Sequence, residues 1–131
     1  MIKTISHLTF IVRDLERTER LLTSVLGAHK VYDSGSKNFS IAREIFFLVG
    51  DIWLAFMEGE ILKERTYNHI AFKIDIADYD EYLTKIHALG LEVQKDRSRV
   101  EGEGRSIYFY DYDHCCPAIL LLAPGKPLIN N

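Results

Sequence analysis

Two histidines lie at matching positions in two similar segments of the chain. The segments "ISHLTFIVRD" (5–14) and "YNHIAFKIDI" (67–76) superpose with His7 on His69 and Phe10 on Phe72, an offset of 69 − 7 = 62 residues. Neutral imidazoles are good ligands for a divalent metal, and two of them leave coordination positions open for water or substrate. A single histidine on a strand is usually an ordinary core or surface residue. The repeat makes a shared metal site a serious alternative for this pair.

Each of these segments is followed by a helical pattern and then by shorter apolar runs. Asp14 can cap a helix over 14–27 that ends at Gly27, and a second helix over 78–90 ends at Gly90. The runs "IFFLVG", "IWLAFME", "SIYFYD" and "AILLL" then predict strands. Each half is thus predicted to be a βαβββ module. The expected fold class is α+β, with two tandem modules that form a curved mixed sheet around a central cavity.

Strand alternation predicts which side chains face this cavity. In the first strand, Leu8, Phe10 and Val12 share one face, which we expect to pack on the helix of the same half. His7 and Thr9 then lie on the opposite face, and His69 occupies the matching position in the second half. If the two open faces curve inward together, both imidazoles enter one cavity.

Size, charge and composition exclude several classes of protein. A chain of 131 residues predicts one domain, 1–131, with repeat halves of about 1–60 and 61–131. The formal charge of −3 argues against nucleic acid or an anionic membrane as a partner. We find no secretory signal and no apolar run long enough to span a membrane. Two adjacent cysteines do not form a disulfide framework, so we expect a reduced, cytoplasmic protein.

The duplicated module with a histidine near the start of each half resembles the vicinal-oxygen-chelate superfamily. This superfamily includes glyoxalases, extradiol dioxygenases, and bleomycin- and fosfomycin-resistance proteins. Within it, "SHLTFIVRDL", "LKERTYNHIAFKI" and "RVEGEGRSIYFYDYD" resemble the FosX-type fosfomycin epoxide hydrolases, and the likeness extends from residue 1 to about 113. The resemblance implies a domain-swapped homodimer that binds Mn(II) or another divalent metal. It also implies hydration of the epoxide of fosfomycin, or of a related small anionic substrate, with water and without a thiol cofactor.

The resemblance also assigns roles to individual residues. His7 and His69 match two of three metal ligands, and Glu44, in "IAREIFF", matches a general base for the attacking water. The candidates for binding the anionic substrate are Thr9, Tyr67, Arg99, Arg105, Ser106 and Tyr108. The chemistry agrees, because epoxide hydration needs a Lewis acid, a base and donors for a phosphonate. Without the resemblance, Glu44 is a solvated strand-edge carboxylate and the arginines are ordinary surface charges.

The chain departs from the family pattern at the third metal ligand. The family has a Glu in the last strand, and counting without gaps through "DYDHCCPA" places Ala118 there. No Asp or Glu occurs after Asp113.

Three alternatives follow from this substitution. His114, Cys115 or Cys116 replaces the missing ligand, and a cysteine would favour Zn(II). Alternatively, two histidines with water or substrate oxygens hold the metal weakly, and activity is impaired. In the third alternative, the cavity binds a small molecule without chemistry, as bleomycin-resistance proteins do. The plainest interpretation of the cysteines is as small apolar residues of a buried final strand. Another enzyme of the glyoxalase superfamily also stays open.

Overall fold

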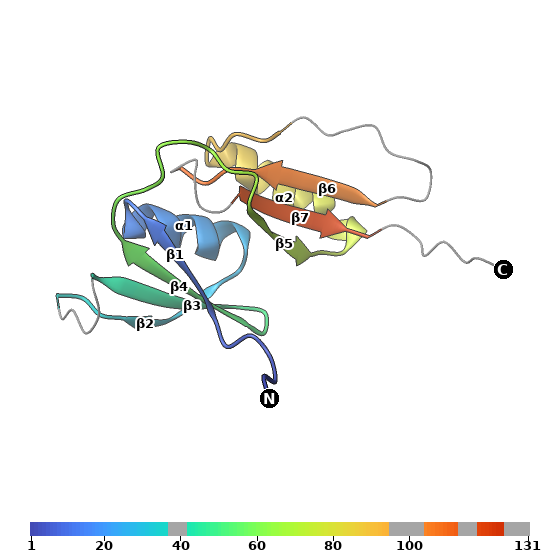
Figure 1. Ribbon diagram of the computed structural model, residues 1–131. Coiled ribbons are helices and arrows are strands. Elements are labelled where there is room, and N and C mark those ends of the chain that lie inside the picture. Colours follow the sequence, from blue (N-terminus) through green and yellow to red (C-terminus); the bar gives the residue numbers. More distant parts are fainter. Residues whose placement is uncertain (37–41, 95–103, 113–117, 125–131) are drawn as a thin grey trace. The chain divides into compact units, whose positions relative to one another are not determined.

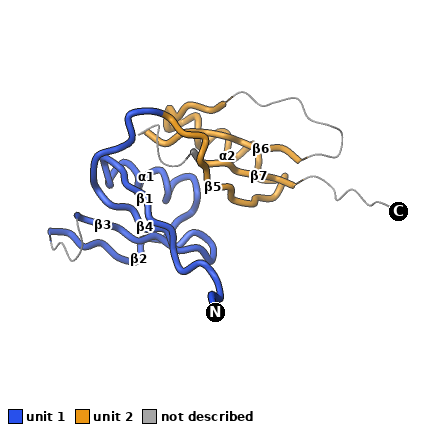
Figure 2. Tube along the Cα trace, viewed as in Figure 1, with its two compact units in different colours: residues 1–64 blue, residues 65–131 orange. Residues whose placement is uncertain are grey.

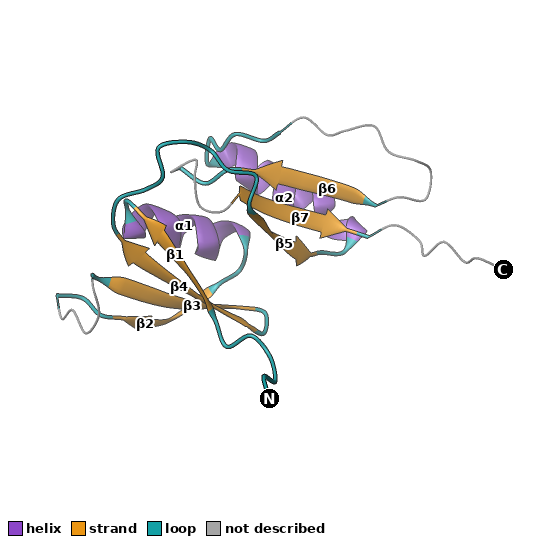
Figure 3. Cartoon of the chain, in the orientation of Figure 1, coloured by secondary structure: helices purple, strands orange, loops and turns teal. Residues whose placement is uncertain are grey.

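The computed structural model describes residues 1–36, 42–94, 104–112 and 118–124, so Arg99, His114, Cys115 and Cys116 lie outside the described residues. The chain divides into two compact units, residues 1–64 and 65–131, close to the predicted boundary between the repeat halves (Figure 2). Each unit combines its own β-sheet with helix, which confirms the predicted α+β class (Figure 3).

Unit 1, residues 1–64, is a four-stranded sheet with a helix on one face (Figure 1). Its elements are β1 (Leu8–Val12), α1 (Leu15–Val25), β2 (His29–Asp33), β3 (Glu44–Val49) and β4 (Ile52–Glu58). The strand order is β1-β4-β3-β2, with β1 parallel to β4 and the other neighbours antiparallel.

The helix α1 begins after the predicted cap, Asp14, and ends at Val25, two residues before Gly27. The Asp14 carboxylate accepts a hydrogen bond from the Arg17 N–H at 3.1 Å, which satisfies one of the free amides at the helix start. Gly27 has φ 63°, a conformation that is costly for residues with a Cβ. The buried residues of α1 and of the sheet beneath it form the core of unit 1: Val12, Leu15, Leu21, Leu22, Val25, Ile45, Phe47 and Leu54.

Unit 2, residues 65–131, has a similar arrangement, and its described residues form a three-stranded sheet. Its elements are β5 (His69–Lys73), the 3₁₀ turn η1 (Ile76–Asp78), α2 (Tyr79–Ala88), β6 (Arg105–Phe109) and β7 (Ala118–Ala123). The order is β5-β7-β6, and β5 is parallel to β7 as β1 is to β4. Among the described residues, Val93 forms a bridge with Phe109 at the position equivalent to β2. The first strand, the helix and the last two strands of the predicted βαβββ module therefore occur in both units.

Among the described residues, no helix is both long enough and apolar enough to cross a bilayer.

Two adjacent phenylalanines test the assignment of the buried face in unit 1. Phe47 is fully buried beneath α1, whereas Phe46 lies on the opposite, partly exposed face. We expect Phe47→Ala to lower the free energy of unfolding by about 3–5 kcal/mol, because it leaves a cavity in the core. Phe46→Ala is the matched control and should cost much less in denaturant titrations. Equal losses would contradict the assignment.

Candidate active site

The sheet of unit 1 has an open face, by which we mean the face turned away from α1. Along β3, Ile45, Phe47 and Val49 are buried, and Glu44 and Phe46 alternate with them on the open face. The strand register extends this face across the sheet. Phe46 pairs with Ala55 in β4, and Ala55 pairs with Thr9 in β1. Thr9 and Glu44 therefore share the open face with His7, as strand alternation predicts.

Glu44 and His7 lie at different ends of this face. Glu44 pairs with Met57, which in turn pairs with Ile11, a residue 11 − 7 = 4 positions after His7. Two strand spacings and four residues would put the Cα atoms of His7 and Glu44 ~16 Å apart in a flat sheet. Both side chains leave the same face of the sheet, with Phe46 on that face between them.

His7 borders a cavity of about 250 Å³ that is lined by Ser6, His7, Phe46 and Trp53. The imidazole packs edge-on against Phe46, with ring centroids 6.1 Å apart. Its Nδ1 is 3.1 Å from the Ser6 hydroxyl oxygen. When Nδ1 donates to this hydroxyl, Nε2 keeps the lone pair that a ligand can use.

His69 is oriented by its own backbone. Its Nδ1 is 2.9 Å from the carbonyl oxygen of Tyr67. Because a carbonyl oxygen can only accept a hydrogen bond, Nδ1 carries the proton and Nε2 carries the free lone pair. Metal-binding histidines in proteins are commonly oriented in this way.

Each of the two imidazoles packs edge-on against an aromatic ring, and the two aromatic residues occupy matching positions in the repeat. His69 packs edge-on against Tyr108 at 5.6 Å, as His7 packs against Phe46. The two aromatic residues are related by 108 − 46 = 62 residues, which equals the offset between the histidines. The repeat therefore conserves the orientation of the imidazole along with its position in the strand.

The strand register places position 118 beside His69. Ala118 is the first residue of β7, and His69 is its partner in the parallel ladder. The position that the family resemblance assigns to the third ligand is thus occupied by a residue without a side-chain donor. Among the described residues, no group of three His, Cys, Asp or Glu side chains could hold a metal ion.

A tyrosine cluster surrounds His69 in unit 2. Tyr67 stacks on Tyr108 with ring centroids 5.8 Å apart, and Tyr110 contacts Tyr108 edge-on at 5.7 Å. The Tyr108 hydroxyl is buried near the Tyr110 side chain, but it meets none of the described residues in good hydrogen-bond geometry. Burial raises the pKa of Tyr108 to about 12, so the hydroxyl keeps its proton. An unsatisfied buried hydroxyl is costly, which makes it a candidate donor to a ligand oxygen.

Of the two arginines predicted to bind the anionic substrate, Arg105 lies among the described residues. Along β6, Ser106 and Tyr108 alternate with the buried Ile107, whereas Arg105 lies on the side of α2. The Arg105 guanidinium is 3.8 Å from the ring centroid of Tyr79 in α2. The substrate-binding roles of Arg105 and of Arg99, which lies outside the described residues, stay predictions.

Another arginine lies next to the tyrosine cluster. The Arg65 guanidinium is 4.3 Å from the ring centroid of Tyr110 and forms an ion pair with Glu92. Arg65 is not among the candidate residues that the family resemblance indicates.

Comparison with known proteins establishes the family. The sequence profile of the Glyoxalase/Bleomycin resistance protein/Dioxygenase superfamily matches residues 4–115, and the chain belongs to this superfamily. The fosfomycin resistance protein FosX of Mesorhizobium japonicum is 60% identical over 114 residues, which are 87% of this chain and 82% of that protein. FosX of Listeria innocua is 52% identical over 114 residues, which are 87% of this chain and 86% of that protein.

A solved structure agrees with these relatives. It is a mutant of FosX from Listeria monocytogenes, in complex with Mn(II) and 1S,2S-dihydroxypropylphosphonic acid. The similarity covers 98% of this chain and 94% of that one, with 47% identity and a TM-score of 0.83. The resemblance to FosX-type proteins that the sequence motifs indicate is confirmed.

Sequence reasoning missed Phe46 and Trp53, which line the cavity at His7. The signal for Phe46 was present, because the 62-residue offset that relates the histidines also relates Phe46 to Tyr108. Trp53 had no such signal. Its place beside His7 depends on the parallel pairing of β1 with β4, which follows from the three-dimensional topology.

The raised pKa of Tyr108 predicts a late phenolate titration. Because the folded state holds the proton more tightly than the unfolded state, folded protein should lose stability as pH rises from about 10 to about 12. Tyr108→Phe should remove that loss, together with the late component of the ultraviolet phenolate titration. At neutral pH the substitution should leave the free energy of unfolding unchanged or raised, since it removes an unsatisfied hydroxyl. A loss above ~1.5 kcal/mol at neutral pH would instead indicate a hydrogen bond at this hydroxyl.

Proposed function

We propose that this chain is a metal-dependent fosfomycin-resistance protein of the FosX type, which hydrates the epoxide of fosfomycin or of a related small anionic substrate. The observation that carries the proposal is the pair of matched histidines, each with Nδ1 hydrogen bonded and Nε2 left for a ligand. The FosX relatives at 60% and 52% identity support it.

We assign His7 and His69 as the nitrogen ligands of a divalent metal, Mn(II) being the first candidate. The donor set fits such a metal only in part, because Ala118 supplies no donor at the third position. Water or substrate oxygens would have to complete the coordination, so we expect weaker metal binding than in FosX. When bound, the metal supplies Lewis-acid stabilisation of the alkoxide that forms as the epoxide opens.

Glu44 is proposed to act as the general base. Water attacks an epoxide carbon, the C–O bond breaks, and the Glu44 carboxylate accepts the proton that the water loses. The ring oxygen takes up a proton to give the diol, and Glu44 releases its proton to solvent. The backbone of Glu44 is held at both polar groups, since its N–H donates to the Ser34 hydroxyl and its carbonyl accepts from the Ser34 N–H, each at 3.0 Å. The backbone position from which the Glu44 side chain extends is therefore fixed on the open face.

The anionic end of the substrate is proposed to bind hydroxyl donors on the open faces. Tyr108 has a buried hydroxyl that meets none of the described residues in good hydrogen-bond geometry, and Ser106 lies on the same face of β6. Thr9 and Tyr67 are further candidates beside the two histidines. We also propose, as the family resemblance implies, that the protein is a cytoplasmic homodimer and uses no thiol cofactor.

A second function is a binding protein that sequesters a small anionic or hydrophobic molecule without chemistry. The observation in its favour is Ala118 at the register position of the third ligand, beside an otherwise intact set of candidate site residues. Calorimetric binding of fosfomycin that is recovered chemically unchanged would favour this function, whereas turnover would exclude it.

The substitution Ala118→Glu tests the metal site. With Mn(II), the parent protein should hydrate fosfomycin slowly, as followed by phosphorus NMR of the diol product. Ala118→Glu should bind Mn(II) more tightly and raise the rate, each by roughly tenfold or more, because it restores a carboxylate beside His69. Ala118→Gln, of similar size but neutral, is the matched control.

Titration of these variants with Mn(II) separates the assignment of the metal site from the catalytic proposal. If Ala118→Glu binds Mn(II) no more tightly than Ala118→Gln, the assignment of the site by resemblance is wrong. If metal binding improves but no diol forms, the site is correctly placed and the catalytic proposal fails.

A further inference from the structure

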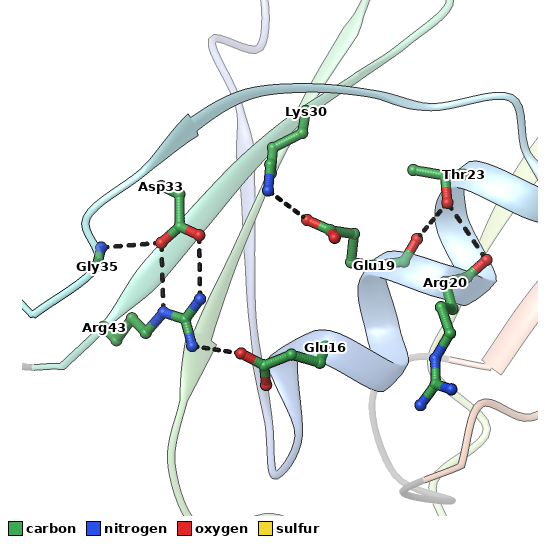
Figure 4. Close-up of polar contacts among 8 residues, drawn as sticks. All are labelled: Glu16, Glu19, Arg20, Thr23, Lys30, Asp33, Gly35 and Arg43. Atoms are coloured by element: carbon green, nitrogen blue, oxygen red, sulfur yellow. Dashed lines mark hydrogen bonds and ion pairs between the residues drawn. The ribbon is translucent and has the colours of Figure 1, made fainter.

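Arg43 and Glu44 are adjacent in sequence but face opposite sides of the sheet of unit 1. Glu44 lies on the open face, and the Arg43 side chain extends to the side of α1 (Figure 4). There, the guanidinium donates two hydrogen bonds to the Asp33 carboxylate, from Nε to Oδ1 at 3.3 Å and from Nη2 to Oδ2 at 3.0 Å. Its third nitrogen, Nη1, donates to Glu16 of α1 at 2.5 Å.

The strand pairing near Glu44 is irregular. The register between β2 and β3 shifts between Lys30 and Tyr32, so regular pairing does not run unbroken along the two strands. On its other side, β3 pairs with β4 without a break from Glu44 to Val49, and this pairing, with the burial of Ile45 and Phe47, sets the face on which Glu44 lies. What the irregularity leaves to be set is the register of the end of β2, where Ser34 meets Glu44.

The contact between Asp33 and Arg43 has the geometry to set it. A two-pronged arginine–carboxylate contact specifies direction as well as distance. Both side chains are partly shielded, at 26% and 29% exposure, so the contact is less screened than one at the open surface. Asp33 also accepts the Gly35 N–H at 2.8 Å, and the Arg43 carbonyl accepts the Glu58 N–H at 3.0 Å.

The charge of the pair persists at neutral pH. The Arg43 guanidinium, with help from the Gly35 amide, holds the pKa of Asp33 below its usual range. The carboxylate thus stays ionised at every pH at which the protein would be expected to work. The outer contact to Glu16 is more exposed, at 66%, and contributes less.

We propose that Asp33 and Arg43 form a positioning pair that fixes the register of the end of β2 on β3, and so holds the Ser34 hydroxyl on the backbone of Glu44. The pair touches no reacting atom, and it acts only through Glu44. Its consequence for catalysis rests on the proposed function, whereas its effect on the register does not.

Amide hydrogen exchange tests the register without reference to activity. Arg43→Met removes the two hydrogen bonds to Asp33 but keeps an extended side chain. We expect the Ser34 and Glu44 amides of this variant to exchange at least ~10-fold faster than in the parent protein, as measured by NMR. Glu19→Gln is the matched control, because it removes the charge of the neighbouring 2.9 Å ion pair between α1 and Lys30 of β2 (Figure 4). Equal exchange at these two amides in both variants would overturn the proposal.

Kinetics then test the link to Glu44. Arg43→Met should lower kcat by ~10-fold or more and leave KM within ~3-fold, since a displaced base slows the chemistry more than the binding. Arg43→Lys should have a kcat between those of Arg43→Met and the parent, because lysine keeps the charge but cannot make the two-pronged contact with Asp33. In a Glu44→Gln background, Arg43→Met should cause no further loss.

The failures of the two proposals are distinguishable. If Glu44→Gln retains the kcat of the parent, the general-base assignment fails, and the exchange rates still decide whether the pair fixes the register. If Arg43→Met lowers kcat equally with and without Glu44, the pair does not act through Glu44, and the positioning proposal is overturned.

Discussion

Burial of one sheet face beneath a helix is the constraint on which the rest of each unit depends. In unit 1, Phe47 and Leu54 are excluded from solvent beneath α1, and in unit 2, Ile107 and Phe109 are excluded in the same way. Because strand side chains alternate, the residues between these positions have to face the other side. The core thus determines the direction of side chains that take no part in it. His7, His69 and Glu44 owe their places on the open faces to the apolar residues beside them.

The strand register also shows why Ala118 matters for the proposed metal site. As the register partner of His69, this residue lies where the family resemblance expects a carboxylate. The two histidines nevertheless keep the features of metal ligands, with Nδ1 hydrogen bonded and an aromatic ring against the imidazole. On the proposed account, the site retains its oriented nitrogen donors and has lost one charged donor. Such a site would depend more on oxygen atoms from water or substrate than a site with three protein ligands.

Much of the fold could be predicted from the sequence because its signals are local. The cap at Asp14, the left-handed Gly27 and the alternation around His7 are properties of neighbouring residues, and each agrees with the structure. What could not be predicted depends on pairing between distant strands. The contact of Arg43 with Asp33 and the place of Trp53 beside His7 both require the sheet order. Alternation along β6 also places Arg105 over Tyr79, a contact that the sequence did not indicate, and its role at the anion stays a prediction.

The central claim is that His7 and His69 bind one metal ion. Electron spin echo spectroscopy of the Mn(II)-loaded protein tests it most directly, because coordinated imidazole nitrogens modulate the echo of the bound ion. The account predicts a signal from two imidazoles in the parent, and from one imidazole in each of the variants His7→Ala and His69→Ala. A signal that is unchanged in either variant, or the absence of nitrogen modulation in the parent, would contradict it.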